Sequence, residues 1–374
     1  MFAKNTKKNT DGQITNVICN SAKQGLIPQR EYFDKDIANS DNTSGYYIIE
    51  ENDFVYNPRK SSDAPYGPIS SYKYPDAGIV SPLYLCFRAK EKINPSFFEW
   101  YFRSSAWHRY VYMSGDSGAR HDRVSIKDDV FFAMPISIPS AREQEHIASF
   151  LDMIDQRIDK QRALVDNLKK YKRGLLFDIL SEKKKVTSKR WSTYRIGDFL
   201  VSKSIKQLPS LEAPLMAFTA TGGVCEKGER YDRGFLVKDA NTKLYKRTDY
   251  GDFIYSSNNL DVGSIGLNLY GSAVISDVYE IFSIENADHW FISEAIQQKN
   301  IMRDILKYRQ GCLYGQYRIY ADDFLSVKIK LPPLDEQKEI GKLFSRIETK
   351  IQHEQNVLAE LERLNTSLLQ QLFI

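Results

Sequence analysis

Residues 134–180, MPISIPSAREQEHIASFLDMIDQRIDKQRALVDNLKKYKRGLLFDIL, decide the fold because the chain repeats them at residues 327–373 as VKIKLPPLDEQKEIGKLFSRIETKIQHEQNVLAELERLNTSLLQQLF. The two copies align at one constant offset without a gap, so that Pro139 matches Pro332 and a Glu-Gln pair follows in both. A long internal repeat predicts a protein of two similar halves. Each half here is a dissimilar block followed by a repeated helix.

Apolar residues in each copy alternate at spacings of three and four, which is the seam pattern of a left-handed coiled coil. Ser140 and Glu143 match a capping box at the start of the first helix. At about 1.5 Å per residue, a helix of about 40 residues would be about 60 Å long. The two helices most simply pair with each other. The predicted seam consists of Ile147, Leu151, Ile154, Ile158, Val165, Leu168 and Leu175 in the first copy, and of Ile340, Phe344, Ile347, Ile351, Leu358, Leu361 and Leu368 in the second.

Polar residues interrupt this seam at matching places in the two copies. One antiparallel register would bring Gln161 against Asn365 and, at the same time, Lys172 against Glu354. Buried polar pairs are known to set the register of coiled coils. We therefore predict these two pairs.

The predicted fold class is α+β, with two mixed α/β domains separated by a long antiparallel coiled coil and related by a pseudo-twofold axis. Short strand-like runs and one helical stretch follow one another in each block. The segment Arg190–Leu200 (RWSTYRIGDFL) has no counterpart near residue 1, so we expect the first block to lack its opening strand. The predicted parts are domain 1 (1–138), spacer helix 1 (139–182), a basic linker (183–190), domain 2 (191–331) and spacer helix 2 (332–374).

Composition limits the function without deciding it. The net charge of +4 is too small to indicate nucleic-acid binding by itself. The 23 Tyr and 20 Phe residues lie partly among Arg and Lys, which suits sugar-phosphate contacts, but strands also favour these residues. The lysine-rich linker is either a solvated connector or a phosphate-facing patch. No apolar run is long enough to span a bilayer, so we expect a cytoplasmic protein.

Motifs for catalysis are missing from the sequence. There is no phosphate-binding loop, no cofactor loop of a methyltransferase with its Asn/Asp-Pro-Pro-aromatic motif, and no histidine pattern for a metal. The four cysteines are scattered and are expected to be reduced thiols. We therefore predict that the chain catalyses nothing alone, and that it has no cofactor or metal of its own.

The segment Leu331–Gln337 (LPPLDEQ), its diverged copy Ile138–Gln144 (IPSAREQ) and the leucine-rich helices that follow them resemble the specificity subunit of Type I restriction–modification systems. The resemblance implies two target-recognition domains, each reading half of a split double-stranded DNA site. It also implies that the helices fix the half-site spacing and dock two modification (methyltransferase) subunits, to which restriction/translocase subunits add. S-adenosylmethionine, ATP and Mg²⁺ would then belong to the partners.

Candidate DNA contacts lie on polar loops after a short strand and before the closing segment of each block. Arg, Asn and Gln suit base edges, while Lys and Ser suit phosphates. Any one of them can equally be an ordinary exposed loop residue. In the first block the candidates are Asn57, Arg59, Lys60, Ser61, Ser117, Arg120, His121 and Arg123. In the second they are Ser256, Ser257, Asn258, Asn259, Arg309, Gln310, Tyr314, Gln316 and Arg318.

Two other functions remain open at this point. The chain could be a non-catalytic coiled-coil scaffold whose two domains bind proteins, or a methyltransferase fragment without its catalytic half. Salt-sensitive binding to a bipartite DNA sequence would distinguish the DNA reader from the scaffold.

Overall fold

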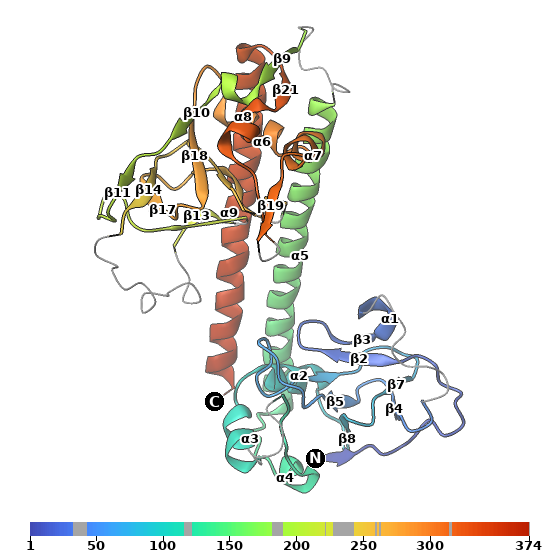
Figure 1. Ribbon diagram of the computed structural model, residues 1–374. Helices are drawn as coiled ribbons and strands as arrows, with labels where there is room; N and C mark the ends of the chain where they lie inside the picture. The colour runs from blue at the N-terminus through green and yellow to red at the C-terminus, as the bar shows by residue number, and fades with distance from the viewer. Residues whose placement is uncertain are drawn as a thin grey trace. The chain divides into compact units, whose positions relative to one another are not determined.

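The computed structural model describes residues 1–32, 43–115, 122–181, 190–220, 222–226, 243–258, 260–261, 263–313 and 316–373. The chain forms two compact units. Unit 1 contains residues 1–163 and 355–374, and unit 2 contains residues 164–354. Each unit therefore combines one mixed α/β part with a section of both long helices (Figure 1).

Unit 1 is built on an antiparallel sheet of four short strands in the order β1-β8-β5-β6. These strands are Phe2–Lys4, Leu85–Ala89, Phe54–Tyr56 and Ile69–Ser71. Smaller pairs are β2 (Ile18–Ser21) with β3 (Gly25–Pro28) and β4 (Tyr47–Ile49) with β7 (Gly78–Val80). The helices are α1 (Gln29–Tyr32), α2 (Pro95–Arg103), α3 (His108–Ser114) and α4 (Asp128–Phe132).

Unit 2 contains the same sheet in the order β10-β18-β15-β16. These strands are Leu200–Lys203, Tyr279–Ile284, Phe253–Ser256 and Ile265–Leu267. The other strands are β11 (Lys206–Gln207), β14 (Tyr245–Thr248) and β17 (Ala273–Ile275), β12 (Ala217–Thr219) and β13 (Gly223–Cys225), β19 (Gln310–Leu313) and β20 (Gln316–Arg318), and β9 (Ser192–Arg195) and β21 (Lys328–Leu331). The helices are the 3-10 turn η2 (Ile196–Asp198), α6 (His289–Ile296), α7 (Lys299–Leu306) and α8 (Ala321–Ser326).

The two units repeat one topology down to the pairing register. Phe54 pairs with Phe87 in unit 1 as Phe253 pairs with Phe282 in unit 2. In both units this sheet precedes two short helices, a third short helix and then a long helix. The predicted α+β fold of two similar domains is therefore confirmed.

The segment 190–200, for which no counterpart was expected near residue 1, contains β9, η2 and the first residue of β10. Strand β1 pairs with β8 as β10 pairs with β18, so β1 is the counterpart of β10. Among the described residues of unit 1 there is no counterpart of β9 and η2, in agreement with the expectation.

Aromatic side chains fill both cores and account for much of the Tyr and Phe content. Tyr56 stacks on Phe131 with ring centroids 5.3 Å apart, and its counterpart Tyr255 stacks on Phe324 at 4.4 Å. All four rings are buried. Burying one such side chain stabilises the fold by about 1.5–3 kcal/mol.

The long helices are α5 (Ala141–Leu180) and α9 (Leu334–Leu372), and they are antiparallel within each unit. In unit 1 the first turns of α5, around Leu151, share a core with the end of α9 at Leu368 and with Phe373 just beyond it. In unit 2 the last turns of α5, around Leu176, share a core with the start of α9 at Phe344. Every residue of the predicted seam is buried or partly buried. No helix in the described ranges is both long and apolar enough to cross a membrane.

The predicted polar pairs of the seam are wrong. The Lys172 ammonium lies 2.8 Å from Glu348 of α9 and 2.6 Å from Glu294 of α6. Glu354 lies nearly two turns further along α9 and pairs with Lys350 instead. The Asn365 side-chain oxygen is buried and accepts no hydrogen bond from the described residues, so Gln161 does not donate to it. Lys172 therefore also binds α6, whose carboxylate no pattern within the long helices reveals.

Hydrogen bonds at the helix starts explain the repeated Pro-x-x-x-Glu-Gln motif. The Gln144 amide donates to the Pro139 carbonyl at 2.9 Å, and Gln337 donates to Pro332 at the same distance. The predicted capping box is confirmed, since the backbone N–H of Ser140 donates to Glu143 at 2.9 Å and the N–H of Glu143 donates back to Ser140 Oγ at 3.4 Å. In the first motif the capping box thus satisfies an N–H group that a helix start leaves unpaired, and in both motifs the glutamine fixes the carbonyl of the proline before the helix.

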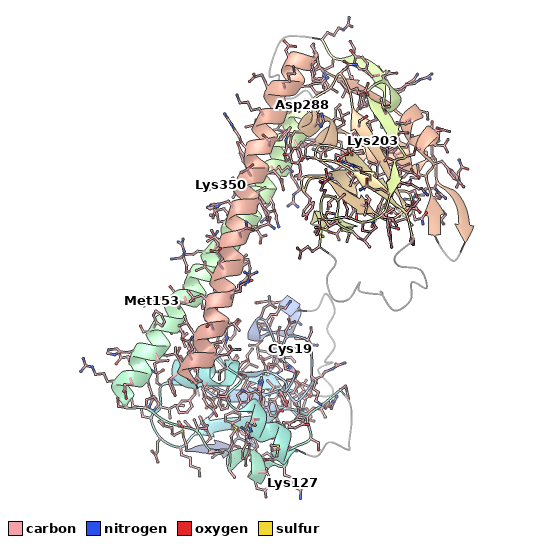
Figure 2. All side chains as sticks on the ribbon, turned by 90° about the vertical axis from the view of Figure 1, so that its left-hand side faces the viewer. Cys19, Lys127, Met153, Lys203, Asp288 and Lys350 are labelled. Carbon is pink, nitrogen blue, oxygen red and sulfur yellow. The ribbon has the colours of Figure 1, made fainter. Side chains whose placement is uncertain are left out.

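The start of α6 lies directly against α9 (Figure 2). Asp288 caps α6 by accepting the Phe291 N–H at 2.9 Å, and its own N–H donates to Gln337 at 3.1 Å. A Cβ at Gly341 would lie 1.8 Å from the Asp288 carboxylate, so only glycine permits this approach. The motif glutamine therefore joins the long helix to the globular part of unit 2.

Candidate nucleic-acid interface

Unit 1 contains a polar groove of about 1430 Å³ beside the loop that follows β5. Its wall combines the β2–β3 hairpin, residues 57–61, Arg123 and side chains of α2, α5 and α9. The charged residues of this wall are Lys23, Arg59, Lys60, Arg103, Arg123 and Arg162 on the basic side and Asp63 and Glu362 on the acidic side. The groove is therefore positively charged and suits an anionic ligand.

The fold brings the two predicted segments of unit 1 together at this groove. Arg59 and Arg123 form an antiparallel bridge, supported by hydrogen bonds from Lys60 N–H to the Asp122 carbonyl at 2.9 Å and from Val124 N–H to the Pro58 carbonyl at 2.8 Å. Residues opposite each other in such a bridge present their side chains on one face, where like charges repel. A bound anion would relieve this repulsion.

The cations of the groove differ in how far the protein neutralises them. Arg162 pairs with Glu362 at 2.8 Å, and Arg103 pairs with Asp155 at 3.1 Å. Arg59 and Lys60 are exposed and have no ion pair within the described part of the chain. The Arg123 Nε is buried without a hydrogen-bond acceptor among those residues, and its nearest carboxylate, Asp122, is 3.8 Å away. Arg59, Lys60 and Arg123 are thus the cations best placed to bind a phosphate or a base edge.

Asn57 holds the loop in place rather than pointing only to solvent. Its amide donates to the Asn20 carbonyl at 3.3 Å, and its side-chain oxygen accepts the Arg59 N–H at 3.1 Å. Gly67 packs so closely that a Cβ there would lie 2.2 Å from the Asn57 carbonyl. Ser61 is exposed and accepts the Ala64 N–H at 3.1 Å. Both residues line the groove, but the hydrogen bonds of their side chains go to other groups of the protein and hold the loop.

Unit 2 brings its predicted segments together in the corresponding way. Asn258 and Arg318 form an antiparallel bridge, with a 2.9 Å hydrogen bond from Ile319 N–H to the Ser257 carbonyl. Arg318 lies 4.9 Å from the Tyr320 ring and 3.7 Å from Glu280. The bridge occupies the same place in the repeated topology as Arg59 with Arg123, after the central strand and before the closing helix.

The other candidates of unit 2 are of two kinds: serines that bond to backbone carbonyls, and longer side chains that bond to carboxylates at the surface. Ser257 is buried and donates to the Val278 carbonyl at 2.8 Å, while Ser256 donates to the Asn258 carbonyl at 2.9 Å. Arg309 is bound by Asp261 at 3.2 Å, and Gln310 donates to Asp323 at 2.6 Å. The serines therefore shape the loop, and the Arg309 and Gln310 side chains are held at the surface.

Some predicted residues cannot be placed. Ser117, Arg120, His121, Asn259 and Tyr314 lie outside the described residues, as does the side chain of Gln316. The linker predicted at 183–190 lies outside them too, except for Arg190. Gly311 has a φ of 68°, which fits the turn expected there.

The structure adds basic residues that the sequence analysis missed. Arg103 and Arg162 reach the groove of unit 1 from helices whose sequence shows only ordinary surface charge. In unit 2, a hollow of about 470 Å³ on α7 is lined by Lys299, Arg303 and Lys307. The spacing of four residues places these three on one helix face, so this patch could have been found from the sequence.

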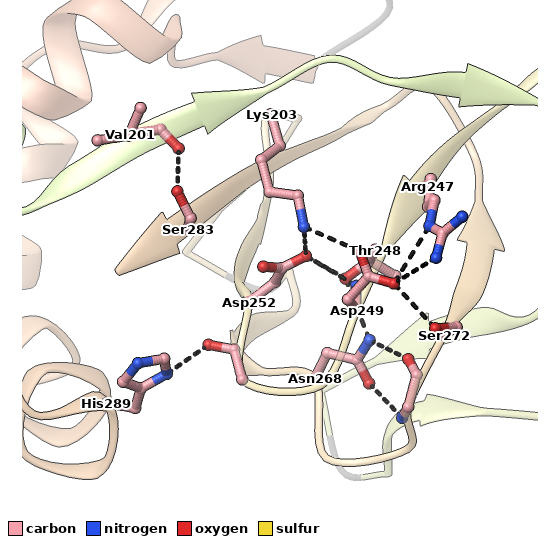
Figure 3. A network of polar contacts seen from close by, with 12 residues as sticks. Val201, Lys203, Arg247, Thr248, Asp249, Asp252, Asn268, Ser272, Ser283 and His289 are labelled. Carbon is pink, nitrogen blue, oxygen red and sulfur yellow. Dashed lines mark hydrogen bonds and ion pairs between the residues drawn. The ribbon is translucent and has the colours of Figure 1, made fainter. Parts of the chain in front are cut away.

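A polar network braces the turn before β15 in unit 2 (Figure 3). Lys203 binds Asp252 at 2.7 Å and Asp249 at 3.0 Å. Burial alone would raise the pKa of Asp249, but hydrogen bonds from Arg247, Lys203 and Ser272 lower it to about 2. These carboxylates are engaged in holding the turn before β15, and their arrangement is structural.

The described part of the chain contains no cluster of metal ligands. No cluster of three or more His, Cys, Asp or Glu side chains there could hold a metal ion. Cys19, Cys86 and Cys225 are free thiols. The polar loops and grooves can bind an anion, and their described residues include no nucleophile–base pair.

The chain is a repeated α+β protein, and each of its two units carries a polar loop bridge and a cluster of basic side chains of the kind that suits nucleic acid. The chain belongs to the family described as Type I restriction modification DNA specificity domain, which matches residues 2–170 and 188–363. The resemblance inferred from the repeated helix motif is thereby confirmed, and the chain is a DNA sequence-recognition subunit. Subunits of this family are not themselves catalytic.

Solved structures show the same fold. The Type-I restriction-modification system S subunit from M. genitalium matches with a TM-score of 0.60 and 14% identity, over 100% of this chain and 94% of that chain. A chain from a structural study of complex assembly and conformational transition of the type I R-M system matches with a TM-score of 0.53 and 16% identity. That match covers 100% of this chain and 97% of the other.

Proposed function

We propose that each unit reads one half of a bipartite double-stranded DNA site, unit 1 through Arg59 and Arg123 and unit 2 through Asn258 and Arg318. The observation that carries this proposal is that the repeated fold forms an antiparallel bridge between these residues at the same place in both units. An arginine can donate two hydrogen bonds to guanine, and an asparagine can pair with adenine. Each such contact discriminates by about 1–3 kcal/mol.

The long helices are proposed to set the distance between the half-sites. A single domain recognises few base pairs, but two domains on one stiff connector bind one duplex together, so their contributions multiply. The seam residues keep α5 and α9 paired, and half-site spacing then follows from the connector, as it does for dimeric DNA readers.

Two modification subunits are proposed to dock on the repeated helices, with restriction/translocase subunits joining them in the cytoplasm. In support, exposed apolar side chains recur at matching positions of the two copies, Phe150 with Leu343 and Tyr171 with Leu364. A surface that occurs twice can bind two copies of one partner. By this proposal S-adenosylmethionine, ATP and Mg²⁺ are bound by the partners.

A binding experiment with the assembled complex tests the proposal. Methylated positions in host DNA would first identify the bipartite site, and gel shifts would then compare that site with half-sites and with scrambled DNA. We expect tight binding only when both halves are present, weakening steeply with salt as phosphate contacts are lost. Equal binding to all sequences, or no binding, would instead favour the protein scaffold.

A further inference from the structure

Glu280 lies between two cations of unit 2. It stands on β18 directly opposite Tyr255 of β15, and 20% of its side chain is exposed. One carboxylate oxygen, Oε2, accepts a hydrogen bond from the Lys246 ammonium of β14 at 2.8 Å. The other oxygen, Oε1, lies 3.7 Å from Arg318 Nη2. A single carboxylate therefore connects the sheet to the guanidinium of the bridge between Asn258 and Arg318.

Lys246 holds this carboxylate in one orientation. Its side chain is 13% exposed, and its ammonium also donates to the Tyr279 carbonyl at 2.7 Å. A charge-assisted hydrogen bond of this kind is shorter and stronger than one between neutral groups. Strand β14 is itself fixed between β11 and β17. Glu280 is thus anchored through Oε2, and Oε1 faces Arg318.

Arg318 is about half exposed, and two groups restrict its guanidinium. Its Cζ lies 4.9 Å from the centre of the Tyr320 ring, and its Nη2 faces Glu280. The N–H donors of arginine lie in one rigid plane, so fixing one edge of the plane orients the donors of the other edge. Recognition of guanine requires two of these donors, aimed at O6 and N7. The two contacts therefore prepare Arg318 for such a pair of hydrogen bonds.

Unit 1 has an apolar residue at the matching place. The sheet register sets Leu85 opposite Tyr56, as it sets Glu280 opposite Tyr255. The four-stranded sheet thus forms in the same register with and without a carboxylate at this position. The fold itself does not require Glu280. Its charge serves the loop that only unit 2 has.

We propose that Glu280 is a positioning residue for base recognition by unit 2. It holds the Arg318 guanidinium in the orientation that donates two hydrogen bonds to a guanine of the half-site. This inference rests on the proposed function of the bridge and names the base that the bridge reads. A carboxylate also repels DNA phosphates, so Glu280 weakens overall DNA binding while it sharpens the choice of base.

Glu280→Gln in the assembled complex separates positioning from charge, because the amide has nearly the same shape. Competition gel shifts would measure base preference at the position where Arg318→Ala loses selectivity. We expect the preference for guanine there to fall about three- to tenfold, which is part of the discrimination of one arginine–guanine pair. Preference at the other half-site should be unchanged, and binding to DNA without a site should tighten.

Asp277→Asn is the matched control for charge. It removes the same charge three residues earlier in the chain, from an exposed pair with Lys206. Binding to DNA without a site should tighten as it does for Glu280→Gln, and base preference should be unchanged at both half-sites. An equal fall in guanine preference for both variants would show that charge alone is responsible and would overturn the positioning role.

A double-mutant cycle gives a readout that a merely structural role would not produce. In the Arg318→Ala background, Glu280→Gln should leave base preference unchanged, because the guanidinium that Glu280 positions is absent. A structural role would instead lower the Tm and reduce selectivity equally in both backgrounds. If Arg318→Ala alters no preference, the proposed function of the bridge fails and the positioning role with it. If Arg318→Ala removes the preference and Glu280→Gln retains it, only the positioning role is overturned.

Discussion

Asn52 and Gly251 occupy the same position in the two units and share an uncommon backbone conformation. Their φ angles are 67° and 87°, and each is the third residue of a tight turn before a central strand. A buried carboxylate closes both turns, Asp53 accepting the Glu50 N–H and Asp252 accepting the Asp249 N–H. Asparagine tolerates a left-handed φ better than most other non-glycine residues, so the two units can use different residue types in the same backbone conformation.

This pair gives a matched prediction on stability. Gly251→Ala should lower the free energy of unfolding by about 1–3 kcal/mol, because it adds left-handed strain and places a Cβ 2.9 Å from the His289 ring. Asn52→Gly should change it by less than about 0.5 kcal/mol, because the conformation suits glycine. Urea denaturation of the two variants measures the difference. Equal changes in the free energy of unfolding for the two variants would contradict the backbone strain that we expect from Gly251→Ala.

The bridges give a second prediction at this scale. Arg59→Ala should weaken selectivity at one half-site only and Arg318→Ala at the other, each by about 1–3 kcal/mol. Competition gel shifts with DNA mutated in one half at a time measure this. Docking of the modification subunits should be unchanged in both variants. Loss of selectivity at the same half-site in both variants would contradict the proposal that each unit reads its own half-site.

At the scale of elements, the register of α5 against α9 in unit 2 involves Lys172. Burial alone would lower the pKa of this lysine, but Glu294 and Glu348 together raise it. Burial raises the pKa of Glu294 in spite of Lys172. The lysine therefore joins α5, α6 and α9 through one charge, and removing it leaves two carboxylates facing each other.

Lys172→Met should consequently destabilise the fold, and more so at alkaline pH. We expect a loss of about 3–5 kcal/mol at pH 8, where the buried Glu294 carboxylate is ionised without a partner. A carboxylate whose folded pKa is raised favours folding while it is protonated and loses that contribution as the pH rises, so the loss should be smaller at pH 5. Thermal unfolding at both pH values measures this. Lys206→Met removes an exposed pair with Asp277 and should have little effect at either pH.

At the scale of the whole molecule, duplication gives one small fold twice, which under the proposed function makes a reader of a bipartite site. Strand order and pairing register repeat, while the loops at the bridges differ in sequence. The scaffold is thus common to both units, and selectivity resides in residues that the scaffold does not constrain. Two different half-sites can therefore be read by one architecture.

A change in helix length tests the proposed spacing at this scale. Insertion of one heptad into each long helix, between Arg162 and Lys172 and between Glu348 and Glu362, preserves the seam and adds about 10 Å. The preferred spacer between half-sites should then grow by about three base pairs, at about 3.4 Å per pair. Methylation-site mapping would reveal the new spacer. The same insertion in one helix only should prevent assembly of the complex. An unchanged DNA spacer in the variant with both insertions would contradict the proposal that the long helices set the distance between half-sites.

The sequence by itself determined the repeat, the two long helices, their capping and the loops that carry the candidate contacts. Such features can be read because they depend on periodicity and on hydrogen bonds between residues close in the chain, such as Gln144 with Pro139. Only the tertiary structure decided the helix register, the burial of Ser257 and the contribution of Arg162 to the groove. These depend on residues distant in sequence, and no local pattern specifies which distant side chain will compete for the same charge or fill the same space.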